Sequence, residues 1–195
     1  MILFVGGLFC YYNFKNYVEN LFYNIKRKEV IYRTCKEVNQ ADIDNADIII
    51  AYSYAIQYMN TLKLYNKKII LLSPLLNDYR FKDIMIKIAE KLVDTKSGIT
   101  KFGTELYCKM IGVNEKSFKY WVEDVQDWVK DYGINESKIQ NIEPKSDWII
   151  IDGFKPICKL PRIDDIATDN NGNKIRHIIN YDNHLLFLDK YLGVK

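Results

Sequence analysis

The chain has 195 residues, of which 48% are hydrophobic and 27% charged, and its formal net charge is +3. These values are typical of a soluble globular domain and exclude a disordered or fibrous chain, and so small a charge does not by itself indicate a nucleic-acid partner. No stretch approaches 18 consecutive apolar residues, and no basic segment precedes the short apolar run at the N-terminus, so we expect no membrane span and no signal peptide. We expect one cytoplasmic domain.

The chain contains four cysteines and two histidines, and no two cysteines form a C-x-x-C pair. This composition argues against a zinc site of the usual Cys/His type and favours free thiols in a reducing compartment. We therefore expect neither a metal ion nor a cofactor.

Six short apolar runs are typical of buried parallel strands. They span residues 2–5, 30–33, 47–52, 68–72, 148–151 and 175–180. Helical patterns lie between the first four runs, most clearly over residues 12–26, where apolar side chains repeat every three to four positions, and also over residues 54–64. This alternation predicts an α/β fold: a mostly parallel sheet of about six strands with helices on both faces.

The alternation stops after residue 72, and no strand pattern returns before about residue 144. The intervening helical patterns cover residues 81–93, 101–111 and 118–132, the last with Ser117 as the expected N-cap and Gly133 as the expected C-cap. We interpret residues 77–143 as a helical cap inserted in the same domain, whose core is formed by residues 1–76 and 144–195.

A candidate nucleophile follows the third strand, where residues 48–55 read IIIAYSYA. A serine on a tight strand-to-helix turn has a strained backbone, and the residues two before and two after it must be small, as in the nucleophile elbow G-x-S-x-G. Here Ala51 and Ala55 flank Ser53 in place of both glycines. The alternative is that Ser53 is an ordinary N-cap residue of the following helix.

A serine nucleophile requires a general base, which is usually a histidine. His184 follows the last strand and a short loop, at the carboxyl end of the sheet where catalytic groups of open α/β sheets gather. His177 lies inside that strand. We therefore assign His184 as the base, with a polar residue at a helix N-terminus as the alternative.

Two glycines, Gly6 and Gly7, follow the first strand and allow the backbone to turn sharply. Such a turn exposes N–H groups that can stabilise a developing oxyanion. A phosphate-binding turn is the alternative, although the third glycine of a dinucleotide fingerprint and the Lys-Ser/Thr pair of a P-loop are both missing.

Taken together, these segments resemble a compact member of the α/β-hydrolase superfamily, over nearly the whole chain. Residues 5–8 are similar to the family's His-Gly oxyanion turn, with Gly6 where histidine is common, and residues 46–55 are similar to its nucleophile strand and elbow. The resemblance implies that the backbone N–H groups of Leu8 and Tyr54 bind the oxyanion. Because the chain begins at the oxyanion strand, the family's first two strands would be absent.

Two further segments complete the resemblance. Residues 68–74 are similar to the strand that precedes the family's helical cap, and residues 183–188 are similar to the segment that carries its histidine. The family also has an aspartate after the strand that begins here near residue 148. We assign this acid to Asp152; Asp164 and Asp165 are alternatives, and Asp152 could instead be a turn residue.

The resemblance implies a serine hydrolase that cleaves a carboxylic ester or thioester through an acyl-enzyme. The carboxylesterases that act on small or acyl-carrier-linked acyl esters are the nearest group, and the aromatic residues of the cap would line an apolar acyl pocket. These residues are Tyr79, Phe81, Phe102, Tyr107, Phe118, Trp121 and Trp128. Two other functions remain open: a catalytically inactive binding or structural protein of the same fold, and a nucleotide- or phosphate-handling protein that uses the two glycines.

Overall fold

The computed structural model describes residues 1–26, 30–76, 79–94, 115–135, 142, 145, 147–155, 172–173 and 176–183. The helices within these ranges are all too short or too polar to cross a lipid bilayer.

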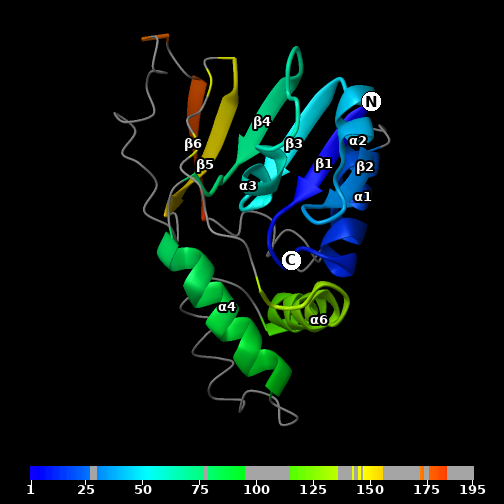
Figure 1. Cartoon of the computed structure of the whole chain (residues 1–195), viewed down its shortest axis with the longest axis vertical. Helices are drawn as coiled ribbons and strands as arrows, with labels where there is room; N and C mark the ends of the chain where they lie inside the picture. Colours follow the sequence, from blue (N-terminus) through cyan, green and yellow to red (C-terminus); the bar gives the residue numbers. More distant parts are fainter. Residues whose placement is uncertain are drawn as a thin grey trace.

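The described strands form a parallel sheet with the order β2-β1-β3-β4-β5-β6 (Figure 1). They are β1 (Ile2–Gly6), β2 (Val30–Thr34), β3 (Ile48–Tyr52), β4 (Lys68–Leu72), β5 (Ile149–Lys155) and β6 (Arg176–Asn183). Together with the helices that join the first four strands, this sheet confirms the predicted α/β class.

Strand β1 lies between β2 and β3, and Ile2 pairs with Val30 on one side and with Ile48 on the other. The chain leaves β1 toward β2 and later returns to the opposite side of β1 to form β3. The connections that follow β1 and β3 therefore leave the carboxyl edge of the sheet in opposite directions. Ligands of open α/β sheets bind at such a topological switch point.

Successive strand residues point to opposite faces of the sheet, so a strand of apolar residues makes both faces apolar. Helices cover both of these faces. On β3, Ile49 and Ala51 belong to one hydrophobic cluster, whereas Ile50 and Tyr52 belong to the other. Helix α1 (Tyr12–Lys26) packs on the second cluster, and helices α2 (Gln40–Asn45) and α3 (Ala55–Met59) contribute to the first. Helix α3 covers only part of residues 54–64, so this helix is shorter than predicted.

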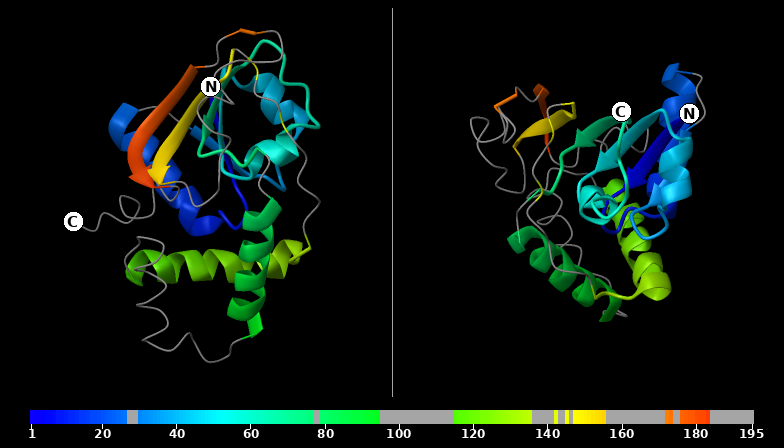
Figure 2. Two further views of the ribbon diagram at one scale, coloured as in Figure 1. Left: turned by 90° about the vertical axis from the view of Figure 1, so that its left-hand side faces the viewer. Right: turned by 45° about the horizontal axis from the view of Figure 1, so that its top comes forward.

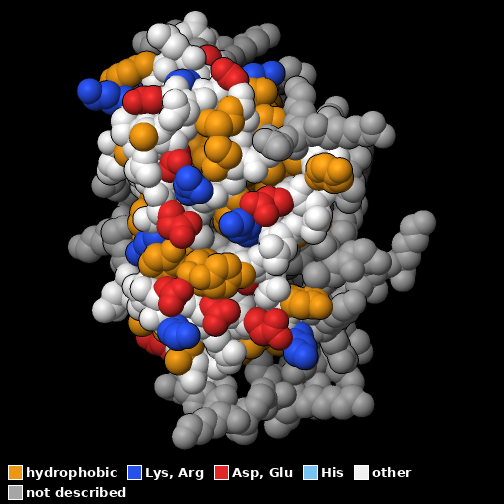
Figure 3. Space-filling view, turned by 90° about the vertical axis from the view of Figure 1, so that its right-hand side faces the viewer, with side chains coloured by type: hydrophobic (Ala, Val, Ile, Leu, Met, Phe, Trp, Pro, Cys, Tyr) orange, Lys and Arg blue, Asp and Glu red, His pale blue; other side chains and the backbone are white. Residues whose placement is uncertain are grey.

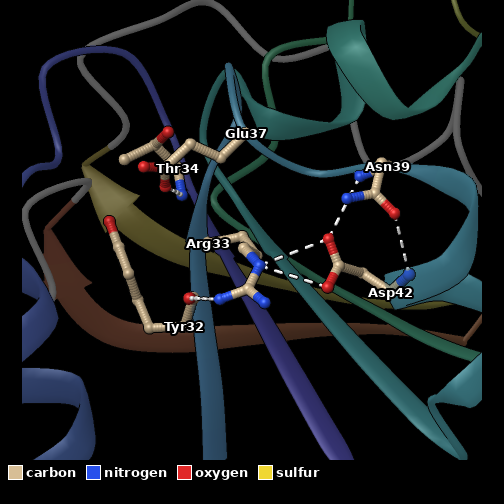
Figure 4. Close-up of polar contacts among 6 residues, drawn as sticks. All are labelled: Tyr32, Arg33, Thr34, Glu37, Asn39 and Asp42. Carbon is tan, nitrogen blue, oxygen red and sulfur yellow. Dashed lines mark hydrogen bonds and ion pairs between the residues drawn. The ribbon is translucent and has the colours of Figure 1, made fainter.

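Helix α2 was not predicted from the sequence, although its start carries a recognisable signal. Asn39 and Asp42 form a capping box, in which each side chain accepts a hydrogen bond from the backbone N–H of the other residue (Figure 4). Asp42 also forms an ion pair with Arg33 at 3.1 Å. The carboxyl end of β2 is held in a similar way, since the N–H of Thr34 donates to the Glu37 carboxylate at 3.0 Å (Figure 4).

Two longer helices follow β4 in the chain: α4 (Tyr79–Asp94) and α6 (Glu115–Tyr132). They lie beyond the carboxyl ends of the strands (Figure 1) and cross each other where they pack together (Figure 2). Helix α6 begins before Ser117, so the predicted N-cap is wrong. Gly133 ends the helix as predicted, with φ at 74° and its N–H donating to the carbonyl oxygen of Val129. The helix predicted over residues 101–111 lies outside the described residues.

The face seen in Figure 3 carries acidic and basic side chains in alternation rather than a patch of one sign. Hydrophobic side chains are interspersed among them. Among the described residues, the most exposed aromatic side chains are those of Tyr23 and Tyr65, with 70% and 71% of their surface exposed.

Candidate functional site

Ser53 follows β3 directly and has a left-handed backbone conformation, with φ at 52°. The sequence predicted a strained backbone at this turn. This conformation is unfavourable for a residue with a Cβ atom. Ser53 is not the N-cap of helix α3, because that position is Tyr54 and its side chain makes no capping hydrogen bond. The alternative interpretation of Ser53 as a simple capping residue therefore does not hold.

Both backbone polar groups of Ser53 are bonded to the end of β4 and the residues after it. The Ser53 N–H donates to the carbonyl oxygen of Leu72 at 2.9 Å, and the N–H of Leu75 donates to the carbonyl oxygen of Ser53 at 3.0 Å. The Gln57 side chain donates in turn to the carbonyl oxygen of Leu75 at 2.8 Å. These bonds hold the serine in its strained conformation, as an elbow that presents a nucleophile requires.

The residues two before and two after Ser53 are the small residues that the elbow needs. Ala51 is 1% exposed and Ala55 is fully buried, so a larger side chain at either position would have to fit into the packed core. Alanine at both positions therefore meets the steric requirement that glycine meets in the G-x-S-x-G pattern.

The glycine turn after β1 packs directly against this elbow. A Cβ atom placed on Gly7 would lie 2.8 Å from the carbonyl oxygen of Tyr52, 3.0 Å from Cβ of Ser53 and 3.0 Å from the backbone nitrogen of Tyr54. Only glycine permits this approach of two backbone segments. The turn is closed by a hydrogen bond from the N–H of Cys10 to the carbonyl oxygen of Gly7. The turn that contains Leu8 and the backbone of Tyr54 therefore meet at the elbow.

If Ser53 is the nucleophile that the sequence predicts, Gly7→Ala should slow its reaction with a phosphonate probe by about tenfold or more, because a misplaced reacting group costs rate even when the fold survives. The matched control is Gly6→Ala, whose Cβ would instead meet the hydroxyl of Tyr32 on the other side of β1. Both variants should lose stability in urea denaturation. A labelling rate per folded molecule that falls equally in both would contradict the specific role of Gly7.

A buried carboxylate, which the sequence analysis missed, lies at the start of helix α1. Asp124 of α6 is 2% exposed and accepts hydrogen bonds from the backbone N–H groups of Tyr11, Asn13 and Phe14 at 3.0, 2.8 and 3.0 Å. Asn13 and Phe14 belong to the first turn of α1 and Tyr11 directly precedes it, so these N–H groups have no partner within the helix. Asp124 thus joins the segment after β4 to the helix that follows the glycine turn.

The environment of Asp124 affects its protonation. Burial raises the pKa of Asp124 to about 6, although the hydrogen bonds from the backbone N–H groups lower it. A second contact, near the C-terminal end of α6, involves the residue before α1: the hydroxyl of Tyr11 donates to the carboxylate of Asp131, and the pKa of Tyr11 is raised by burial and by this bond.

The structure places the other candidate residues as follows. Asp152 lies inside β5, which continues to Lys155, so the expectation that Asp152 follows the end of its strand is wrong. His177 lies inside β6 as predicted. His184, Asp164 and Asp165 lie outside the described residues. The described site therefore brings together Ser53, Tyr54 and the turn of Leu8.

No protein-family model, curated protein or solved structure matches the chain.

Proposed function

We propose that the chain is a serine hydrolase of the α/β-hydrolase type, with Ser53 as its nucleophile. The observation that carries this proposal is the strained backbone of Ser53, at φ 52°, on a strand-to-helix turn at the carboxyl edge of a parallel sheet. The bonds to Leu72 and Leu75 fix this conformation, and the approach of Gly7 supports it. Strain of this kind persists where surrounding structure imposes it and is concentrated at active sites.

In the proposed reaction, Ser53 Oγ attacks the acyl carbonyl and His184 takes its proton. The same imidazole then protonates the leaving alcohol or thiol, and a water molecule hydrolyses the acyl-enzyme. The backbone N–H groups of Leu8 and Tyr54 would bind the oxyanion, since the residue after the nucleophile and the turn after an earlier strand supply these donors in such folds. Asp152 would orient His184; no cofactor is required.

We further propose that α4 and α6 belong to a helical cap over the site and that the sheet is a compact version of about six strands. Their place beyond the carboxyl ends of the strands supports this (Figure 1). Small acyl esters or acyl-carrier-linked esters are the proposed substrates. Of the aromatic residues expected in the acyl pocket, Trp128 is fully buried in the core and therefore belongs to the packing of α6.

The buried carboxylate argues against the phosphate-binding interpretation of the two glycines. In phosphate-binding α/β folds, the N–H groups at the start of the helix after the first strand hold the anion. Here Asp124 already accepts hydrogen bonds from those groups. A phosphate at that position would have to displace a buried negative charge.

Labelling with a fluorophosphonate probe tests the proposed function. We expect the folded protein to be labelled and the Ser53→Ala variant to remain unlabelled, because the probe phosphonylates an activated serine. Mass spectrometry of the labelled peptide would locate the adduct. If folded native protein is not labelled, the enzyme proposal is wrong and a non-catalytic binding protein of this fold is favoured. Adduct on another residue would also contradict the assignment.

A further inference from the structure

The turn between β1 and helix α1 has a strained backbone of its own. The hydrogen bond from the N–H of Cys10 to the carbonyl oxygen of Gly7 closes a β-turn whose central residues are Leu8 and Phe9. Phe9 has φ at 60°, in the left-handed region where a β-turn usually has glycine. A residue with a side chain keeps this conformation only where the surrounding structure imposes it. The contacts of the turn must therefore supply that constraint.

Helix α6 contacts this segment through two residues that are four positions apart and so share one face of the helix. The ring of Trp128 packs edge-on against that of Phe9, with 6.0 Å between the ring centroids, and both side chains are fully buried. The carboxylate of Asp124 accepts the hydrogen bond from the N–H of Tyr11 at 3.0 Å. Helix α6 therefore holds the strained residue of the turn and also the chain directly after the turn.

Strand β2 holds the same segment between these two contacts. The hydroxyl of Tyr32 donates a buried hydrogen bond to the carbonyl oxygen of Cys10 at 2.8 Å. Residues 9–11 are thus each fixed by a side chain from an element that lies elsewhere in the chain. The turn itself packs against the nucleophile elbow through Gly7. A loss of these contacts would therefore change the position of Leu8 relative to the elbow.

We propose that Asp124 is a positioning residue of the hydrolase, which holds the turn so that the backbone N–H of Leu8 can bind the oxyanion. This inference rests on the proposed function, in which Leu8 and Tyr54 supply the oxyanion donors. Such donors must lie about 3 Å from the oxyanion, and a displacement of about 1 Å can lower the rate about 100-fold. The bond from Tyr11 to Asp124 fixes the chain three residues beyond Leu8. Asp124 acts through the turn and does not touch the substrate.

Hydrolysis of p-nitrophenyl acetate and inhibition by 1,1,1-trifluoroacetone test this inference. Ser53 Oγ adds to the ketone carbon, its proton passes to the general base, and the carbonyl oxygen becomes an oxyanion, so the inhibition constant reports on the oxyanion donors. For Asp124→Ala we expect kcat per folded molecule to fall about tenfold or more and the inhibition constant to rise by a similar factor. KM should stay within about twofold, because only binding of the transition state is weakened.

Three further variants separate positioning from folding. Ile69→Ala truncates a fully buried side chain near the amino end of β4, so it should lose stability in urea while kcat and the inhibition constant per folded molecule stay within about twofold. Asp124→Asn keeps an oxygen that can accept from the N–H of Tyr11, so its kcat should stay within about threefold. Where Asp124→Ala does not fold, Trp128→Phe replaces it: the smaller ring packs less tightly on Phe9, and kcat and inhibitor affinity should fall together.

An active native enzyme whose kcat and inhibition constant are unchanged in the folded Asp124→Ala or Trp128→Phe variant would overturn this inference alone. A loss of the same size in Ile69→Ala or in Asp124→Asn would also overturn it, since the effect would then follow stability rather than the bond to Tyr11. A folded native protein that neither hydrolyses the ester nor reacts with fluorophosphonate would overturn the proposed function and the inference with it.

Discussion

Replacement of Ser53 by alanine is expected to lower the turnover of an activated ester by about 10⁴-fold or more, since removing a serine nucleophile eliminates the acyl-enzyme route. The stability of this variant should stay close to that of the native protein, because alanine also carries a Cβ atom at φ 52°. Steady-state kinetics and urea denaturation of the same preparation would measure both quantities. Turnover within tenfold of native would remove Ser53 from the mechanism.

The Ser53→Gly variant should lose turnover equally but be more stable than Ser53→Ala by about 1 kcal/mol, because glycine adopts a positive φ without a steric penalty. A difference of this sign would show that the elbow holds strain for function at the expense of stability. Asn66 provides the control, since it has φ at 59° in the loop before β4. Asn66→Gly should leave turnover unchanged. Equal stability of the glycine and alanine variants at position 53 would contradict the strain argument.

The elements that were predicted most accurately are those with a continuous pattern of apolar residues within a single segment. The bounds of helix α1 and of strand β4 agree with the predicted ranges 12–26 and 68–72. Strand β5 was predicted to end at residue 151, where its apolar run ends. In the structure the ladder continues, and Gly153 pairs with Asn180 of β6. Pairing with a neighbouring strand thus overrides local preference.

The candidate site shows the same division between local and distant information. The turn at Ser53 follows from its own strand and the small residues beside it, which is why eight residues were enough to predict it. Asp124 lies 110 to 113 residues along the chain from the N–H groups that it caps, and in the sequence it is one charged residue on an amphipathic helix. Its position next to Val125, which is fully buried, was the available signal. Only the packing of α6 against α1 shows its partners.

Substitution of Asp124 by alanine is expected to lower the free energy of unfolding by about 3 kcal/mol or more, because two buried N–H groups and a partly buried one lose their acceptor. The charge also interacts favourably with the positive end of the dipole of α1. Asp124→Asn should give an intermediate loss. One oxygen can still accept from Tyr11 and Phe14, but the amide group would face the N–H of Asn13. Urea denaturation at pH 7 would measure both losses.

The pH dependence of stability identifies the contribution of Asp124 more directly. Its pKa is about 6 in the folded chain and 3.8 for an unperturbed aspartate, so the folded state binds the proton more tightly than the unfolded state. The contribution of Asp124 to the free energy of unfolding must therefore decrease as pH rises from about 4 to about 6 and then stay level. The difference between native protein and Asp124→Ala isolates this slope from other titrating groups, and Glu123→Gln on the same helix should retain it. A native-minus-variant difference that is flat over this range, or that rises with pH, would show that burial does not control the protonation of Asp124.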